Sequence, residues 1–430
     1  MKLFEEPNRN QWMDLITRPS GHDLSQDSLV ENILQEVKSQ GDMALKKYTA
    51  KFDQVTLTSF IVTNDEIEHA ISVVVEELKK AIHLAKSNIE TFHTSQIRDF
   101  KIIETMPGVQ CWQKAKPIEK IGIYIPGGTA PLFSTVLMLA VPAKIAGCNE
   151  IILCSPPDKN GNLNPSILFA AHICGVTKIF KAGGAQAIAA MAYGTKEIPS
   201  VFKIFGPGNS FVTAAKMKVQ QEGIAIDMPA GPSEVLVCAD DTADPEWVAI
   251  DLLSQAEHGV DSQVVLVTDS KELATKVQEQ IKIQLKELPR KSFANGALNH
   301  SHVIILKNME DQIDFINAYA PEHLIINHVN ADEIAGRINN AGSVFIGPYS
   351  PESVGDYASG TNHTLPTSAY ARAYSGVNLD SFTKKITYQK LTAEGLIGIG
   401  PTVEIMAEAE HLIAHKLAIT KRLDKIKKQE

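Results

Sequence analysis

The stretch from Lys120 to Gly147 reads KIGIYIPGGTAPLFSTVLMLAVPAKIAG. A short apolar run of strand length leads into a turn with two adjacent glycines, and a long apolar segment of helix length follows. This order is typical of a buried parallel strand joined to a covering helix. It predicts an α/β fold in this part of the chain.

The same rhythm continues on the C-terminal side of this stretch. Strand-like segments recur at EIILCSP (150–156), KIFKA (178–182) and KIFG (203–206), with helical segments between them. A second run of the same kind extends from QVVLVT (263–268) to GSVFIG (342–347). Residues 1 to about 118 and those after about 402 have mainly helical patterns. We therefore predict two α/β units, each with a mostly parallel sheet, flanked by helical segments.

Composition restricts the class of protein. The chain has 430 residues, a length that predicts two or three domains. Its formal net charge of −9 argues against general nucleic-acid binding. No apolar run approaches the ~20 residues of a membrane span. The five cysteines are scattered, and the N-terminus lacks the apolar core of a secretory signal. We expect a cytoplasmic protein with reduced thiols and no membrane or nucleic-acid partner.

Four glycine- and proline-rich turns follow strand-like segments. They begin at Tyr124, Ala182, Phe205 and Asp227. Such turns let a ligand approach the backbone, and the next helix offers N–H groups to a phosphate. None matches G-x-G-x-x-G, and glycine turns commonly end strands, so a nucleotide site and ordinary turns both remain possible. The polar residues in and beside these turns are Tyr124, Gln186, Asn209 and Ser233.

The segment LLSQAEHGVDSQ (252–263) ends a predicted helix with polar side chains. Asp244, followed by a proline, predicts the start of this helix, and Gly259 predicts its end. Gln255 and His258 are three residues apart and therefore share a face of the helix. By itself this pattern fits an ordinary polar helix end as well as a ligand site.

Three further clusters pair histidine with a carboxylate. Glu322 and His323 are adjacent before an apolar strand, and they face one pocket only if the backbone there is irregular. Asp356 and His363 lie in a glycine-bearing loop, and EAEHLIAH (408–415) is expected to place three such residues on one helix. The residues of this last cluster are Glu410, His411 and His415. Imidazole and carboxylate ligands suit a catalytic Zn²⁺, although spacing alone does not select the ligands.

Several long motifs give the chain a specific resemblance. They include GGAQAIAAMAYGT (183–195), DMPAGPSEVLV (227–237), DLLSQAEHG (251–259) and GDYASGTNHTLPT (355–367). Together with APEHL (320–324) and the stretch from Tyr124, they resemble the histidinol dehydrogenase family across nearly the whole chain. The resemblance implies two incomplete Rossmann-like domains, one inserted into the other. The implied ranges are an N-terminal arm (1–22), a first domain (23–123 and 238–377), an inserted NAD-binding domain (124–237) and a helical C-terminal tail (378–430).

The resemblance also implies an activity: the NAD⁺-dependent oxidation of L-histidinol to L-histidine through L-histidinaldehyde, by two hydride transfers. It implies one Zn²⁺ per subunit and a homodimer whose active sites are shared between subunits. Glu322 and His323 resemble the family's acid/base pair. The implied zinc ligands are Gln255, His258, Asp356 and His415, and the implied NAD⁺ contacts are Tyr124, Gln186 and Asn209. The implied substrate contacts are Ser233, Gln255, His258, His323, Asp356, His363, Glu410 and His415.

Two other functions fit the sequence less well than this one. A zinc hydrolase using His411 and His415 is disfavoured, because the spacing is not His-Glu-x-x-His and the glycine loops would have no role. A non-enzymatic protein that binds NAD or a metal is disfavoured by the presence of Glu322 and His323. Reduction of NAD⁺ in the presence of histidinol would separate both from the dehydrogenase.

Overall fold

The computed structural model describes residues 1–19, 24–127, 130–229 and 231–429. The chain forms two compact units. The first contains Met1–Gln96 and Ile118–Phe382, and the second contains Ile97–Pro117 and Thr383–Glu430. Across the described residues, no helix is both long and apolar enough to cross a membrane.

The first unit holds a parallel sheet of five strands, as counted in the described ranges. They lie in the order β6 (Lys178–Lys181), β5 (Glu150–Ser155), β4 (Lys120–Tyr124), β7 (Lys203–Phe205) and β8 (Ala225–Ile226). From β4 the chain moves outward through β5 to β6, and it then crosses back to place β7 on the other side of β4. In open α/β sheets, ligands bind at the carboxyl ends of the strands where the order reverses in this way.

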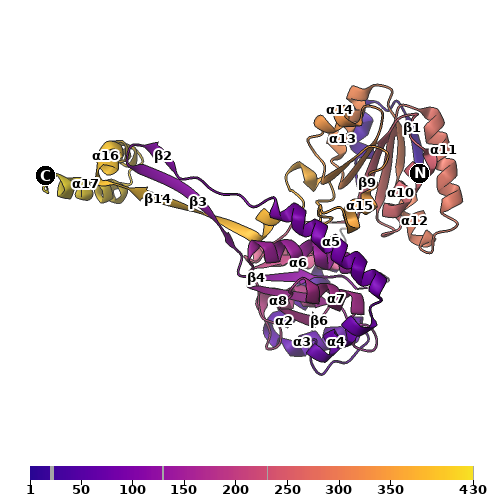
Figure 1. The fold of residues 1–430 in the computed structure, drawn as a ribbon, viewed down its shortest axis with the longest axis horizontal. Helices are drawn as coiled ribbons and strands as arrows, with labels where there is room; N and C mark the ends of the chain where they lie inside the picture. The colour runs from indigo at the N-terminus through magenta and orange to yellow at the C-terminus, as the bar shows by residue number, and fades with distance from the viewer. Residues whose placement is uncertain (20–23, 128–129, 230, 430) are drawn as a thin grey trace. The chain divides into compact units, whose positions relative to one another are not determined.

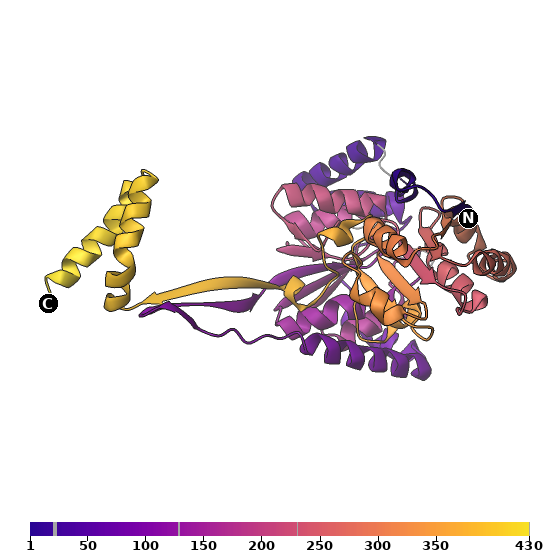
Figure 2. The ribbon, with the colours of Figure 1, turned by 90° about the horizontal axis from the view of Figure 1, so that it is seen from above.

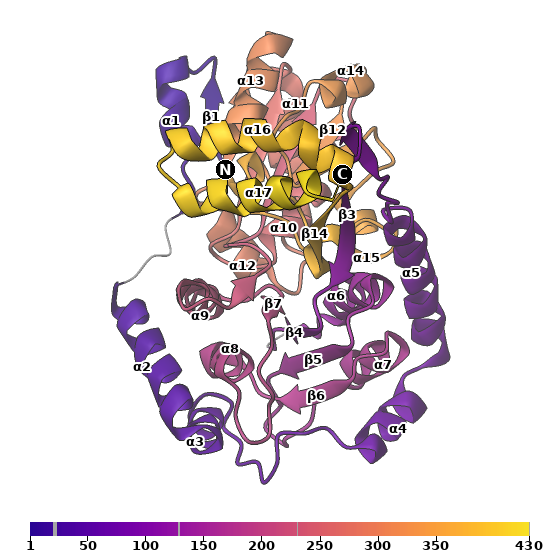
Figure 3. The same ribbon diagram turned by 90° about the vertical axis from the view of Figure 1, so that its left-hand side faces the viewer.

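Helices cover both faces of this five-stranded sheet (Figure 3). One face packs against α4 (Asn64–Val73), α5 (Glu76–Thr94), α6 (Phe133–Ala146) and α7 (Pro165–Ile173). The other packs against α2 (Leu24–Gln40), α3 (Asp42–Phe52), α8 (Gly184–Tyr193) and α9 (Ser210–Gln221). In β5, Ile151 and Leu153 face the first group, and Ile152 faces the second. This burial on both faces explains why the strands are apolar throughout.

The first unit also holds a parallel six-stranded sheet within the described ranges. The order is β1 (Lys2–Glu5), β11 (His302–Ile305), β10 (Gln263–Thr268), β9 (Glu234–Ala239), β12 (His323–Asn327) and β13 (Ser343–Ile346). One face packs on α10 (Pro245–Ala256), α11 (Lys271–Gln284) and α12 (Lys291–Leu298), and the other on α1 (Trp12–Leu15), α13 (Met309–Tyr319) and α14 (Ala331–Gly336) (Figure 1). The short elements η1 (Arg9–Gln11), α15 (Glu352–Tyr357), η2 (Tyr370–Arg372) and η3 (Leu379–Phe382) complete this unit.

The second unit joins two distant segments of the chain. Its strands β2 (Ile103–Met106), β3 (Val109–Pro117) and β14 (Thr383–Leu391) form an antiparallel sheet, followed by α16 (Ala393–Ala409) and α17 (Ile413–Lys427). Figure 2 shows the two helices in yellow after β14. The backbone near Gly108 approaches α16 so closely that a Cβ there would lie 2.3 Å from Thr392 Oγ1. Only glycine fits this contact, since its φ is +74°.

The α/β fold class is confirmed, whereas several local details differ from expectation. The segment 378–430 was expected to be helical, but β14 pairs with β3 over nine residue pairs. Likewise, β1 adds a strand to the six-stranded sheet in a region expected to be mainly helical. Helices α2–α5 pack on the five-stranded sheet, although they fall in the range 23–123 that was grouped with 238–377. The boundaries of independent domains stay a prediction.

Candidate functional site

A cavity of about 1330 Å³ opens at the carboxyl ends of the strands of the five-stranded sheet. Residues of the loops after β4, β5, β6 and β7 line it, including the three expected NAD⁺ contacts Tyr124, Gln186 and Asn209. Its place next to β4, where the strand order reverses, is the usual ligand position in such sheets. Gly128 and Thr129 of the first glycine loop, and Ala230 of the last, lie outside the described residues.

The polar groups of this cavity are held in fixed positions. The Tyr124 hydroxyl accepts a hydrogen bond from the Gly184 backbone N–H at 3.0 Å. Asn209 caps α9, because its Oδ1 accepts from the Val212 backbone N–H at 3.1 Å. The Gln186 side chain is buried, and its Oε1 has no hydrogen-bond partner. An unpaired buried amide oxygen is costly, so Gln186 offers an acceptor that a ligand can satisfy.

The glycine loops approach each other closely at this edge of the sheet. Gly206 has a φ of +121°, and a Cβ built there would lie 2.1 Å from the Tyr124 carbonyl oxygen. Any side chain at this position would push the loop after β7 away from β4. Glycine is therefore required by both the backbone conformation and the contact.

Asp53 was not among the residues expected from the sequence. Its carboxylate lines the same cavity, and its Oδ2 is buried without a hydrogen-bond partner. Burial raises the pKa of Asp53 to about 6. The residue directly follows α3, about 70 positions before the first glycine loop, so local sequence patterns gave no sign that it reaches the cavity.

Glu322 and His323 lie at the start of β12, beside β9. The turn begins at Ala320, whose φ of +52° ends α13, and this irregular backbone lets both side chains lie on one side. His323 Nδ1 lies 3.6 Å from Glu322 Oε2 and 3.1 Å from the Glu234 carbonyl oxygen. Glu322 Oε2 in turn accepts from the Glu234 backbone N–H at 2.9 Å. Ser233 directly precedes this anchoring residue.

The two members of this pair have shifted pKa values. Burial raises the pKa of Glu322 above its usual value. Burial alone would lower the pKa of His323, but the Glu322 and Asp356 carboxylates outweigh it and raise that pKa well above the ordinary value. His323 Nε2 lies 3.2 Å from Asp356 Oδ1. His323 is thus buried between two carboxylates, those of Glu322 and Asp356, and such perturbed groups are candidates for a functional site.

Gln255 completes the surroundings of His323. It lies in the last turn of α10, and its Nε2 is 3.3 Å from His323 Nδ1, while its buried Oε1 has no partner. The expected helix start is confirmed, since Asp244 accepts from the Glu246 backbone N–H at 2.8 Å. The helix ends at Ala256, before Gly259. His258 lies in the turn that follows, and its backbone N–H donates to the Gln255 carbonyl oxygen.

Asp356 interacts with three histidines. It lies in α15, not in an open loop as expected. Burial would raise the pKa of Asp356, but a hydrogen bond with His323 and the nearby histidines lower it. Desolvation lowers the pKa of His258, although part of this residue is exposed. Desolvation also lowers the pKa of His363, which is more enclosed. An ionised carboxylate and neutral imidazoles are the forms that bind metal ions.

Two further residues of this region were missed by sequence reasoning. Glu352 is buried behind Gln255, and burial raises its pKa to about 8. Thr135, in α6, lies with its Oγ1 3.0 Å from His363 Nε2. This contact joins the helix after the first glycine loop to the loop that carries His363. Neither residue stands in a motif that marks it, since one begins a short helix and the other lies inside an apolar helix.

Glu410 and His415 belong to the second unit, and both are exposed. The expectation that EAEHLIAH forms one helix is wrong. Glu410 ends α16, and His411 has a φ of +58°, so the chain turns before α17 begins at Ile413. In the described part of the chain, no three His, Cys, Asp or Glu side chains form a group that could hold a metal ion. The expected zinc ligands include a glutamine and span both units, so they would not form such a group.

Comparisons with known proteins give one consistent result. The family model for histidinol dehydrogenase matches residues 16–423. A histidinol dehydrogenase of Bacteroides fragilis is 59% identical over 428 residues, covering 100% of both chains, and one of Escherichia coli is 53% identical over 402 residues, covering 93% of this chain and 92% of its own. The crystal structure of histidinol dehydrogenase from Elizabethkingia anophelis is 55% identical, with a TM-score of 0.97 and 99% coverage of each chain. This chain belongs to the histidinol dehydrogenase family.

Proposed function

We propose that this protein oxidises L-histidinol to L-histidine through L-histidinaldehyde, with NAD⁺ as the acceptor of two hydrides. The observation that carries the proposal is the cluster around His323. A buried histidine contacts two carboxylates and a glutamine with an unpaired oxygen, in a chain of the histidinol dehydrogenase family. The reaction balances when one histidinol, two NAD⁺ and one water give one histidine carboxylate, two NADH and three protons.

The cofactor is assigned to the cavity of the five-stranded sheet. Its volume of about 1330 Å³ exceeds the ~300–1,000 Å³ of common small-molecule sites, which suits an extended dinucleotide. The unpaired Gln186 Oε1 and Asp53 Oδ2 supply acceptors for its hydroxyl and amide groups. Helix α9, capped by Asn209, presents its N-terminal end to the same cavity.

His323 is proposed to act in the first oxidation. The ring takes the proton of the substrate hydroxyl while a hydride moves from the carbon that carries this hydroxyl to the nicotinamide. In the structure the Asp356 carboxylate contacts His323 Nε2 and helps to raise the pKa of the ring, which favours its protonated form. A metal ion bound by Asp356, its expected role, would weaken this contact and favour the neutral ring that can act as a base.

Glu322 is proposed to act in the second oxidation. Its raised pKa makes it a stronger base than an ordinary carboxylate, and one of its oxygens is held by the Glu234 backbone N–H. It removes a proton from water as the water adds to the aldehyde carbon. The resulting gem-diol then loses the second hydride and becomes the acid.

The residues of the first unit fit the expected zinc ion. The lowered pKa values of Asp356 and His258 favour the ionised carboxylate and the neutral imidazole, and the buried Gln255 Oε1 lacks a partner. With His415 of the second unit they would make four ligands. When bound, Zn²⁺ would fix the imidazole and amine nitrogens of histidinol and so orient the carbinol carbon.

A substrate assay tests the proposal directly. Purified protein should form NADH from L-histidinol, with two NADH produced for each histidinol consumed. Failure to oxidise histidinol would contradict the proposal. A yield of one NADH with accumulating aldehyde would contradict the second step only.

Removal of the metal is expected to abolish turnover. Without the metal ion, nothing would hold the substrate nitrogens and so orient the carbinol carbon. The protein should be chelated, shown to be metal-free by elemental analysis, and assayed before and after addition of Zn²⁺. Full activity of the metal-free protein would contradict the proposed role of the ion.

Asp53→Asn is expected to raise stability and to weaken NAD⁺ binding. The folded-state pKa of Asp53 is raised to about 6, so this group's contribution to stability is present below about pH 4 and is lost as pH rises through about 6. A full shift of this size is worth ~3 kcal/mol, and the partial exposure of the residue reduces the expected gain at pH 8 to about 1 kcal/mol. Urea unfolding at pH 4 and pH 8, with titration of NAD⁺, measures both effects.

Asp65→Asn is the matched control for this prediction. Asp65 also lines the cavity, but it is exposed in the first turn of α4. It should change neither stability nor NAD⁺ binding appreciably. If the two variants behave alike, the effect of Asp53 is only that of a general negative charge.

The second unit supports a homodimer. Its buried apolar side chains, among the described residues, are Val109, Ala407 and Leu423. Large apolar side chains of α16 and α17 are exposed, including Ile405 at 69% and Met406 at 59%. Monomeric proteins rarely leave so much apolar surface uncovered. We propose that a second copy covers it, which would bring His415 and Glu410 to a site shared between two chains.

A further inference from the structure

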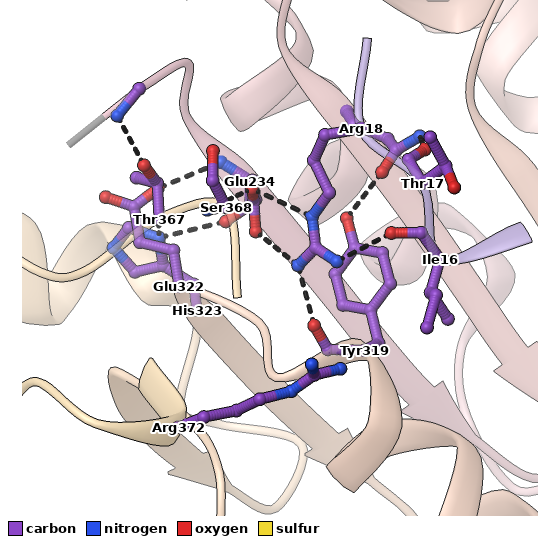
Figure 4. A network of polar contacts seen from close by, with 12 residues as sticks. Ile16, Thr17, Arg18, Glu234, Tyr319, Glu322, His323, Thr367, Ser368 and Arg372 are labelled. Atoms are coloured by element: carbon purple, nitrogen blue, oxygen red, sulfur yellow. Dashed lines mark hydrogen bonds and ion pairs between the residues drawn. The ribbon is translucent and has the colours of Figure 1, made fainter. Parts of the chain in front are cut away.

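Near the end of the N-terminal arm lies Arg18, a largely buried arginine that no part of the proposed chemistry uses. The Arg18 guanidinium donates two parallel hydrogen bonds to the Glu234 carboxylate, from Nε to Oε1 at 3.0 Å and from Nη2 to Oε2 at 2.8 Å (Figure 4). The two side chains are only 12% and 1% exposed. A forked contact of this kind fixes orientation as well as distance.

Two backbone carbonyl oxygens and an aromatic ring also contact the Arg18 guanidinium. Its Nη1 donates to the Ile16 carbonyl oxygen at 2.8 Å, and its Nη2 also donates to the Tyr319 carbonyl oxygen at 2.7 Å. The guanidinium stacks on the Tyr319 ring, 3.6 Å from the centroid. The ring is itself fixed, because its hydroxyl donates to Gln263 Oε1 at 2.9 Å. Arg18 therefore ties the arm to the end of α13 and to the start of β9.

Glu234 connects Arg18 to the proposed acid/base pair, Glu322 and His323. Its side chain faces Arg18 and also accepts from the Ser368 backbone N–H at 2.6 Å. Its backbone faces the other way: the N–H donates to Glu322 Oε2, and the carbonyl oxygen bonds to His323 Nδ1. Figure 4 shows these contacts in one continuous network. A shift of Glu234 would move the hydrogen-bond partners of both groups together.

We propose that Arg18 is a positioning residue, which fixes the orientation of Glu322 and His323 through Glu234. The inference rests on the proposed roles of those two residues. Buried ion pairs are weak evidence for stability, since apolar pairs of similar volume often hold a structure equally well. The geometry here serves orientation instead, because the clamped residue is the one whose backbone contacts the pair.

Arg9 provides a matched control on the same arm. It also pairs with two carboxylates, Asp311 at 2.7 Å and Asp314 at 2.6 Å, and lies over an aromatic ring, that of Trp12. Its side chain is 62% exposed, and its partners lie on the outside of α13. Arg9→Met therefore tests whether the arm needs only to be attached.

The experiment compares Arg9→Met, Arg18→Met, Arg18→Lys and the double variant Arg18→Met with Glu234→Gln. Each is assayed for alcohol and aldehyde oxidation, well below its own melting temperature. Arg18→Met should lower kcat of both steps by roughly 10–100-fold, with much smaller changes in KM, because misaligned groups lose rate more than binding. Arg18→Lys keeps the charge but not the fork, so it should retain stability and still lose rate.

The double variant separates positioning from mere stability. Arg18→Met should lower the melting temperature, because it leaves the Glu234 charge buried and unpaired. Neutralising Glu234 should restore that temperature without restoring kcat. Recovery of kcat together with stability, or full kcat in Arg18→Met, would overturn the inference. Normal rates in Glu322→Gln would instead overturn the proposed roles on which it rests.

Discussion

Glu322→Gln is expected to slow aldehyde oxidation by ~10²–10⁴-fold while alcohol oxidation falls far less. The amide keeps the shape of the side chain and can still accept from the Glu234 backbone N–H. It cannot take a proton from water, so hydration of the aldehyde would lose its proposed base. The two steps are separated by supplying histidinaldehyde directly and comparing its oxidation with that of histidinol under single-turnover conditions.

Glu352→Gln is the control for this variant. Glu352 is another buried acid of the same region, but its pKa is raised to about 8, so at pH 7 it is already mostly neutral. Replacing it should affect both steps equally and by a much smaller factor. Equal losses of both steps in Glu322→Gln would show that Glu322 has a different task.

Mixing two inactive variants is expected to restore activity if the sites are shared. His258 lies in the first unit and His415 in the second, and loss of either expected ligand should inactivate the proposed homodimer. In a mixed dimer of His258→Asn and His415→Asn, one site carries both changes and the other carries neither. Random exchange makes half the dimers mixed, so about a quarter of the wild-type rate should return.

A second mixture controls for this result. His258→Asn with Asp356→Asn places both changes in the first unit. Each site of that mixed dimer contains one defect, so no activity should return. If the first mixture also stays inactive after exchange has been verified by mass, each site is built from a single chain.

The sequence was informative where the signal is local. Alternating apolar strands and glycine turns predicted both parallel sheets, and the Asp244–Pro245 pair predicted the start of α10. Tyr124, Gln186 and Asn209 line one cavity because Tyr124 ends a parallel strand, whereas Gln186 and Asn209 lie at the starts of helices that follow such strands. Their roles, and those of the other predicted site residues, stay predictions that the variants above test.

Contacts between distant segments could not be predicted in this way. Asp53 reaches the cavity from a helix of the N-terminal region, and Arg18 reaches Glu234 across 216 positions. Strand β14 has a pattern that fits an exposed strand, but its partner β3 lies more than 260 residues earlier. His411 broke the predicted terminal helix through a backbone conformation that non-glycine residues rarely adopt.

The pairing of β3 with β14 also sets an order of events during synthesis. The ribosome releases β3 long before β14 exists, and the nine-residue ladder cannot form until about nine tenths of the chain has been made. Until then β3 lacks its long partner strand and exposes backbone groups that other chains could pair with. Such non-local pairing is slow, because a long loop must close before any contact stabilises it. The α17 helix that carries His415 therefore belongs to the part of the molecule that matures last, and a nascent chain acquires its expected fourth zinc ligand only at the end of folding.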